Sequence, residues 1–365
     1  MKNKKNIIIT GIGLIAVVII FVFIMNMDLQ KEKNETVVGF IMSGSKDDEG
    51  WNGMHYDGIK EATDEINTKL IVKENVAEFK GECKNAVKQL AKEKADIIIL
   101  SSYNYSQEVA KLVKKYPKIA FYGNSSEYHD KNLSSYFVRY YQGRYLSGVL
   151  AGLQTKKDKI GYVAAMSNNE VNRGINAFTL GVKSVNEDAE VFVKWTDTWD
   201  DEKKEKKAAN LLIEKVKVDV VAYHQNQSYV IEEADKKDVY SIGYHQAFDN
   251  FSDKYLTSVV CNWKLVYKEM IKEYEQGRAN EHPNFWIGME RDVVGLSKYS
   301  SQVSDKTKKE IEKAKNRIIK GKDVFSGNIK DNKGKKRCEE GEIIQDEILL
   351  EQMDWFVEGV KIYEE

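Results

Sequence analysis

Short apolar runs, each followed by a polar loop and then by a helical pattern, recur along this chain and limit the folds open to it. The first unit, residues 37–65, begins with VVGFIM, passes through a loop rich in Gly, Ser and Asp, and continues with apolar residues at helical spacing. Residues 95–100 (ADIIIL) form a near-continuous apolar run, which is typical of a strand buried on both faces. Strands that alternate with helices in this way predict an α/β fold with doubly wound parallel sheets.

A second series of the same kind begins at residues 159–166 (KIGYVAAM). With 365 residues, the chain is also too long for one ordinary core. We therefore expect two lobes, the first formed by 36–138 plus about 250–285 and the second by 139–249 plus about 286–365. Because the chain passes between them more than once, we expect a multi-strand hinge and a ligand cleft between the lobes.

Composition excludes some classes of partner. Lys plus Arg number 56 against 57 Asp plus Glu, so no net positive field attracts nucleic acid, and we expect no nucleic-acid partner. The three cysteines, Cys83, Cys261 and Cys338, lie far apart and show no metal-binding spacing. We interpret them as free thiols, with a disulfide between two of them left open, and we expect no metal or cofactor.

The N-terminal stretch has the pattern of a membrane anchor. Lys2, Lys4 and Lys5 precede an apolar run at residues 7–25 that is about long enough to cross a bilayer as a helix, with the lysines on the cytoplasmic side. No small-x-small cleavage site and no nearby lipid-accepting cysteine follow the run. We expect residues 1–30 to be a single-pass anchor that holds the binding domain outside the cytoplasm at the cell membrane; a cleaved signal peptide is the alternative.

Rings and polar side chains follow the ends of several predicted strands. In the first half these candidate ligand-binding residues are Asp48, Trp51, Asn52, Tyr103, Tyr105 and Asn124. The carboxyl ends of parallel strands meet at one edge of a sheet, where ligands bind, and rings with polar neighbours suit a small flat ligand. Asp48 could equally cap the following helix, and Trp51 could equally staple its first turn to the core.

The second half repeats this arrangement. Its candidate ligand-binding residues are Trp199, His224, Tyr244 and His245. A single His after a strand is either a ligand contact or a satisfied core residue, and no third ligand at metal spacing accompanies His224 or His245. If His245 contacts the ligand, we expect affinity to change between about pH 5.5 and 7.5. Asp197, Asp200 and Asp201 precede a Lys/Glu-rich helix and are interpreted as caps.

Several blocks, in order along the chain, are similar to those of one family. The first loop, with Asp48, Gly50, Trp51, Asn52, Tyr56 and Gly58, resembles the pattern D-x-S-F-N-x-x-x-W-x-G. IAFYGNS at 119–125, GRYLSGVLAG at 143–152 and TSVVCN at 257–262 are similar too. Over residues 37–365 the chain thus resembles the basic membrane protein family of extracytoplasmic substrate-binding proteins, which includes purine-nucleoside receptors of ABC importers.

The resemblance implies a fold and a set of roles. The fold would be that of a type I periplasmic binding protein. In the nucleoside receptors of the family, rings sandwich the base, while carboxylates and a lysine hold the ribose. By resemblance Trp51 takes a ring position, Asp48 and Asn52 take polar positions, and Asn124 stands where many members have Asp.

Two departures from the family pattern bear on the ligand. Tyr244 and His245 stand where nucleoside-binding members have Asp, and Cys261 stands where they commonly have Lys. A buried site that hydrogen-bonds a hydroxyl discriminates strongly for it, so loss of this charged pair should relax or change the ligand. We therefore expect a purine nucleoside, a free purine base or another flat heterocycle.

These observations favour a membrane-anchored solute receptor that is not an enzyme, that closes over a small ligand and that works with an ABC permease or with a membrane sensor. An exported hydrolase of nucleosides or sugars is an alternative, but the sequence has no G-x-S-x-G or H-E-x-x-H motif. A structural or signalling module that has lost its ligand is a third hypothesis; it predicts a melting temperature that no candidate ligand changes.

Overall fold

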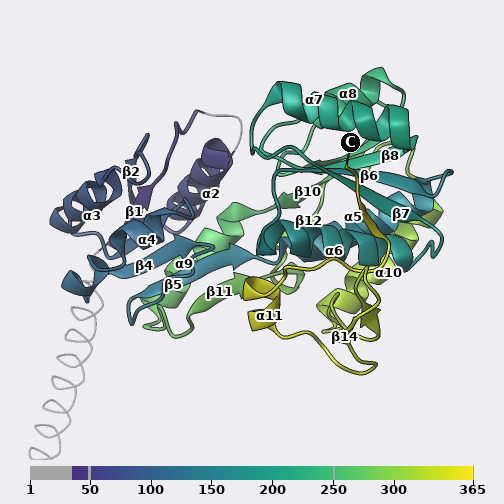
Figure 1. Ribbon diagram of the computed structural model, residues 1–365. Coiled ribbons are helices and arrows are strands. Elements are labelled where there is room, and N and C mark those ends of the chain that lie inside the picture. The colour runs from purple at the N-terminus through teal and green to yellow at the C-terminus, as the bar shows by residue number, and fades with distance from the viewer. Residues whose placement is uncertain (1–34, 48–50, 250, 365) are drawn as a thin grey trace, which may run out of the picture.

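The computed structural model describes residues 35–47, 51–249 and 251–364, and in this part the chain forms two α/β lobes (Figure 1). The strands of the first sheet are β1 (Val37–Ile41), β2 (Lys69–Lys73), β3 (Ile97–Leu100), β4 (Ala120–Asn124), β5 (Leu133–Val138) and β11 (Asn284–Ile287). Their order is β11-β5-β4-β3-β1-β2, and every neighbouring pair is parallel. The prediction of a parallel sheet is confirmed for this lobe.

Helices cover both faces of the first sheet, since its central strands are apolar on both sides. These helices are α2 (Trp51–Glu65), α3 (Glu82–Lys92), α4 (Tyr105–Val109), the 3-10 turn η1 (Val113–Lys115) and α9 (Trp263–Glu275). All four residues of β3 are fully buried, as its apolar run predicts. The α3 helix buries an apolar stripe, including Val87 and Leu90, against the sheet, whereas α2 and α9 pack against each other.

The second lobe has its own sheet. Its strands are β6 (Lys159–Ala164), β7 (Glu190–Trp195), β8 (Val220–His224), β9 (Tyr240–Tyr244), β10 (Tyr255–Cys261), β12 (Val294–Leu296) and β15 (Val360–Ile362). The order is β12-β10-β9-β8-β6-β7-β15. All neighbours are parallel except β10 and β12, which are antiparallel at the edge.

Two closely packed helices lie beside this sheet. The helices of the second lobe are α5 (Tyr140–Gln154), α6 (Asn169–Lys183), α7 (Glu202–Leu211) with its π-helical continuation η2 (Leu212–Val216), α8 (Tyr229–Lys236), the 3-10 turn η3 (Met289–Arg291) and α10 (Asp305–Ile319). A Cβ on Gly148 of α5 would lie 2.0 Å from the carbonyl oxygen of Phe178 on α6. The glycine therefore allows the two backbones to approach each other.

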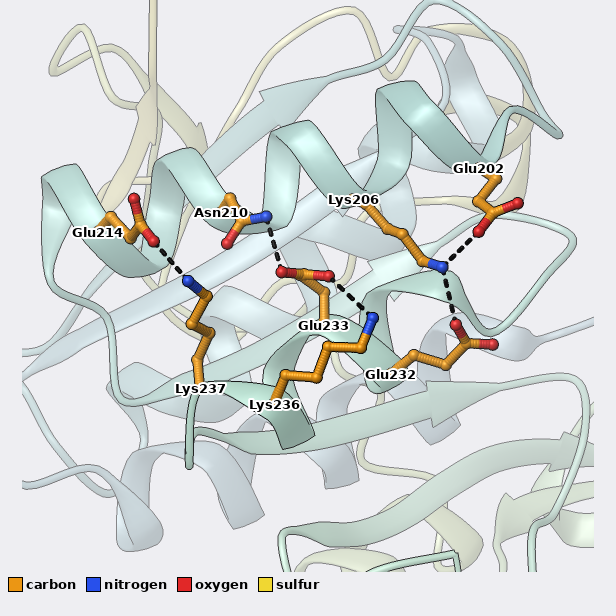
Figure 2. A network of polar contacts seen from close by, with 8 residues as sticks. All are labelled: Glu202, Lys206, Asn210, Glu214, Glu232, Glu233, Lys236 and Lys237. Atoms are coloured by element: carbon orange, nitrogen blue, oxygen red, sulfur yellow. Dashed lines mark hydrogen bonds and ion pairs between the residues drawn. The ribbon is translucent and has the colours of Figure 1, made fainter.

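The outer face of the second lobe carries a network of charged side chains that joins α7 and η2 to α8 (Figure 2). Lys206 lies 2.5 Å from Glu202 of its own helix and 2.9 Å from Glu232 of α8. Glu214 pairs with Lys237 at 2.7 Å farther along. Exposed ion pairs stabilise a fold by only about 0.2–1 kcal/mol each, so this network mainly fixes how the two helices lie against each other.

Caps determine where several helices begin. Asp201 caps α7, accepting a hydrogen bond from the backbone N–H of Lys204 at 3.0 Å, which confirms its interpretation as a cap. Asn168 caps α6 in the same way through Val171 at 2.9 Å. The three cysteines are free thiols.

The chain crosses between the lobes three times within the described residues: after Val138, after Cys261 and after Ile287. We expected all of 250–285 in the first lobe, and this was wrong for β10, which pairs with β9 in the second sheet. After β10 the chain crosses back, and α9 and β11, which are green in Figure 1, lie beside the purple and blue elements of the first lobe.

The C-terminal segment returns along the second lobe. It contains the hairpin β13 (Ile329–Lys330) and β14 (Lys336–Cys338), the short helix α11 (Asp346–Glu351) and the edge strand β15. The predicted anchor, residues 1–30, lies outside the described residues. Among the helices that the structure does describe, none combines the length and the apolar character needed to cross a membrane.

Candidate functional site

A cavity of about 620 Å³ lies between the two lobes, at the carboxyl ends of strands from both sheets. From the first lobe it is lined by residues at or just after the ends of β1, β3 and β4, including Ser43, Ser101 and Asn124. From the second lobe it is lined by residues at or just after the ends of β6, β8 and β9, including Met166 and His224. Its volume lies in the range of small-molecule sites, and the carboxyl ends of parallel strands are where such ligands bind.

The structure brings seven of the ten predicted site residues together at this cavity. They are Trp51, Tyr103, Asn124, Trp199, His224, Tyr244 and His245. Asp48 lies outside the described residues. Three of the seven come from the first lobe and four from the second, so the candidates from the two halves of the sequence face one cavity.

Two predicted residues lie elsewhere and are corrected. Tyr105 has none of its surface exposed, and its hydroxyl donates to the carbonyl oxygen of Val76 at 2.6 Å, so it belongs to the core of the first lobe. Asn52 is not among the residues lining the cavity. Its Oδ1 accepts a hydrogen bond from the backbone N–H of Gly44 at 3.0 Å, so its amide helps to hold the first loop.

Trp51 is anchored in the first lobe and also lines the cavity. Its Nε1 donates to the carbonyl oxygen of Ser101 at 3.1 Å. Its ring centre lies 4.0 Å from that of His55 and 6.0 Å from that of Trp263, both in the first lobe. It also lies 5.7 Å from the ring of His245 in the second lobe. The core role and the cavity position, which we weighed as alternatives, therefore occur together, and the ring is pre-oriented.

Aromatic rings stand where the family resemblance places a carboxylate. The ring centre of Tyr244 lies 3.6 Å from that of His245 and 4.6 Å from that of His224. Behind this wall the guanidinium of the buried Arg144 lies 3.7 Å from the centre of the Tyr244 ring and donates to the carbonyl oxygen of Tyr223. Arg144 thus supports the Tyr244 ring by a cation–π contact.

The two cavity histidines are neutral at pH 7. Burial lowers the pKa of His224 to about 4, and the positive charge of Arg144 acts in the same direction. Burial also lowers the pKa of His245 well below its ordinary value, as do the neighbouring His224 and Arg144. Any change in affinity that depends on the charge of His245 is therefore expected at a lower pH than an ordinary histidine would give.

A carboxylate and a guanidinium that we did not predict as site residues enter the cavity from the first turns of α6. Glu170 lies 3.7 Å from Nε2 of His224. Burial alone would raise the pKa of Glu170, but the neighbouring His224 and the charges of Arg173 and Arg144 outweigh that effect and lower it. Glu170 and Arg173 lie in the run NNEVNR, which follows the first strand of the second series. This run is equivalent in position to the loop that holds Trp51, and that equivalence was the pattern from which both residues could have been predicted.

Some polar atoms of the cavity lining are buried without a hydrogen bond from any described residue. They include Oγ of Ser101 and Nδ2 of Asn124 in the first lobe and Nδ1 of His224 in the second. A buried polar group without a partner costs on the order of 1–3 kcal/mol. Such atoms at a cavity are therefore candidates for hydrogen bonds to a bound ligand.

Two parallel-sheet lobes with a cavity at the strand ends between them form the architecture of periplasmic binding proteins. The same fold occurs in solved solute-binding proteins of ABC transporters. Residues 35–328 match the family described as ABC transporter substrate-binding protein PnrA-like, so the chain belongs to this Bmp family. The resemblance noted from the sequence is confirmed. Because this is a family of solute-binding proteins, which are not enzymes, the hydrolase alternative is not supported.

Individual relatives agree with this assignment. A purine-binding protein of Brucella abortus is 33% identical over 327 residues, which cover 88% of this chain and 92% of that protein. A protein of Haloferax volcanii, provisionally named an ABC transporter glucose-binding protein, is 31% identical over 86% of this chain and 77% of its own length. A crystal structure of a transcriptional activator from Bacillus halodurans has a TM-score of 0.70 at 22% identity, covering 79% of this chain and 99% of that one, and shows a shared fold alone.

Proposed function

We propose that this protein binds a purine, as a nucleoside or as the free base, between its two lobes and delivers it to an ABC permease. Residues 1–30 anchor it in the cell membrane, with both lobes outside the cytoplasm. Binding involves no chemical change of the ligand, which stabilises the closed arrangement by contacting both lobes.

The observation that carries this proposal is the composition of the cavity wall. Seven of the aromatic residues that the structure describes line it: Trp51, Tyr103, Phe137, Trp199, Tyr244, Phe285 and Trp286. Unpartnered amide, hydroxyl and imidazole atoms accompany the rings. Rings that offer flat faces and a few polar atoms that fix orientation suit a planar ligand with polar edges.

The relatives name two ligands of different chemistry. The Brucella abortus relative is named for purine binding and the Haloferax volcanii relative for glucose binding. Both ligands stack on rings, but a purine offers an aromatic face on each side, which makes use of rings contributed by both lobes. Tyr244 and His245, where the family resemblance expects a ribose-binding carboxylate, favour a ligand whose base supplies most of the contacts.

The experiment is native mass spectrometry of the full-length protein, purified in mild detergent without refolding, followed by calorimetric titration with adenine, hypoxanthine, adenosine, inosine, guanosine and glucose. We expect an intact purine base or nucleoside to be carried through purification or to bind on titration. Binding of glucose alone, or of none of these compounds, would contradict the proposal.

A sensing role is a second candidate, because a Bacillus subtilis relative that is 24% identical over 76% of this chain is named a transcriptional activator protein. The two roles differ in cells. If the protein delivers ligand, cells without it lose uptake of the radiolabelled purine. If it is a sensor, uptake continues and only the transcriptional response to the purine is lost.

A further inference from the structure

The C-terminal segment, residues 345–353, forms one wall of the ligand cavity. Leu350 and Glu351, at the end of α11, line the cavity together with the β11 residues Phe285 and Trp286. The match to the family ends at residue 328, so this wall lies beyond the part of the chain on which the family assignment depends. In Figure 1 the segment is the yellow stretch that carries α11, and α11 packs against α6.

Polar side chains of α6 hold this wall in place. Arg173, whose side chain is almost entirely buried, donates from Nη1 to the carbonyl oxygen of Leu349 at 2.6 Å. Asn172, equally buried, donates to the carbonyl oxygen of Met353 at 2.9 Å. These two hydrogen bonds fix the backbone on both sides of Leu350 and Glu351. The Glu351 side chain is therefore presented from a rigid segment, which makes it suited to select a ligand.

A second attachment joins the wall to the point where the chain first crosses between the lobes. Arg139, which follows β5, donates to both carboxylate oxygens of Asp346 in α11, at 2.8 and 2.5 Å. The guanidinium of Arg139 also lies 4.2 Å from the ring centre of Trp286. A bidentate pair of this kind is geometrically specific, so α11 has a defined position relative to the first lobe as well.

The charge of Glu351 is unbalanced. Its side chain is exposed, and no hydrogen bond or ion pair from the described residues reaches it. Four carboxylates line the cavity, those of Glu78, Glu127, Glu170 and Glu351, whereas Arg173 is the one Arg or Lys among the described lining residues. The guanidinium of Arg173 is already engaged with a backbone carbonyl. The cavity lining as a whole therefore favours hydrogen-bond donors and disfavours anions.

We propose that Glu351 is a specificity-determining residue of the ligand site, whose carboxylate accepts a hydrogen bond from a hydroxyl or amino group of the ligand and rejects ligands that carry phosphate. The inference rests on the proposed function, because it concerns the same cavity and deepens the description of its ligand. The Glu351 carboxylate thus selects purine bases and nucleosides over nucleotides.

The test compares wild-type full-length protein with two variants, Glu351→Gln and Glu347→Gln. Glu347 lies on the same helix and is exposed, but does not line the cavity, so its variant is matched in charge and position. The probes are the purine bases and nucleosides named above and adenosine 5′-monophosphate. We expect Glu351→Gln to weaken binding of the best unphosphorylated purine by roughly tenfold, as loss of one charge-assisted hydrogen bond predicts. Glu347→Gln should stay within twofold of wild type.

Equal affinities in all three proteins, or the same loss in both variants, would overturn the inference while leaving the proposed function intact. So would binding of adenosine 5′-monophosphate by the wild type as tightly as adenosine. If no purine binds the wild type, the proposed function fails, and native mass spectrometry then tests the inference alone. A carried molecule depleted only in Glu351→Gln supports it, whereas equal retention, or an empty site in every sample, overturns it.

Discussion

Replacement of Trp51 by alanine removes an aromatic side chain that is held in a fixed orientation on the first-lobe side of the cavity. The ring is oriented by the hydrogen bond from Nε1 to the Ser101 carbonyl and by contacts with His55 and Trp263. Because these contacts are made within the first lobe itself and do not depend on a ligand atom, little ordering cost offsets stacking when a ligand binds. The binding free energy lost in Trp51→Ala should therefore approach the full stacking energy.

Stacking of a base on an aromatic side chain is worth on the order of 1–3 kcal/mol by alanine substitution. This corresponds to a rise in Kd of roughly 5- to 150-fold. Trp51→Phe keeps a ring face but leaves the Ser101 carbonyl without its donor, so we expect a smaller rise in Kd and a loss of stability of about 0.5–1.5 kcal/mol.

The assay is isothermal titration of the wild type and of both variants with the best purine ligand, with apo melting curves measured in parallel. Trp195→Ala is the matched control, since Trp195 contacts Phe356 in the second lobe and does not line the cavity. A wild-type Kd in Trp51→Ala would remove Trp51 from the site. A similar loss of affinity in Trp195→Ala would show that the effect comes from general destabilisation.

Three further predictions concern stability. Because burial lowers the pKa of His224 from 6.5 to about 4, only the unfolded chain gains a proton there between these values. The contribution of neutral His224 to the free energy of unfolding is thus complete above pH 6.5, and roughly 3 kcal/mol of it is lost as the pH falls towards 4. In urea unfolding at pH 7 and 4.5, His224→Gln should lose less stability on acidification than the wild type, and an unchanged pH dependence would contradict this. Gly148→Ala places a Cβ against the backbone of Phe178 and should lower the free energy of unfolding by about 1–3 kcal/mol. Gly295→Ala, with open space around it, should be nearly neutral in the same assay, and equal effects would refute the close packing of α5 on α6. Tyr105→Phe should lower the free energy of unfolding by about 0.5–1.5 kcal/mol without changing ligand affinity, and a changed Kd would return Tyr105 to the site.

The amino-acid sequence was sufficient to predict the parallel sheets and much of the cavity lining. A strand covered by helices on both faces needs apolar residues at every position, and β3 shows this directly in its four consecutive buried residues. Polar and aromatic residues that follow such strands must come to the same edge of the sheet. Trp51 and Asn124 could therefore be predicted to meet at one edge of the first sheet, and His224 and Tyr244 at one edge of the second, although they are far apart in the chain.

Only the tertiary structure decided the direction of individual side chains and the lobe against which β10 and the C-terminal segment pack. Tyr103 and Tyr105 are two residues apart, yet Tyr103 lines the cavity while Tyr105 enters the core, because α4 begins at Tyr105 and turns this first residue inward. Local composition does not specify which sheet β10 joins, since either sheet would bury it. The wall formed by Leu350 and Glu351 depends on hydrogen bonds between residues more than 170 positions apart, and no local sequence pattern records such contacts.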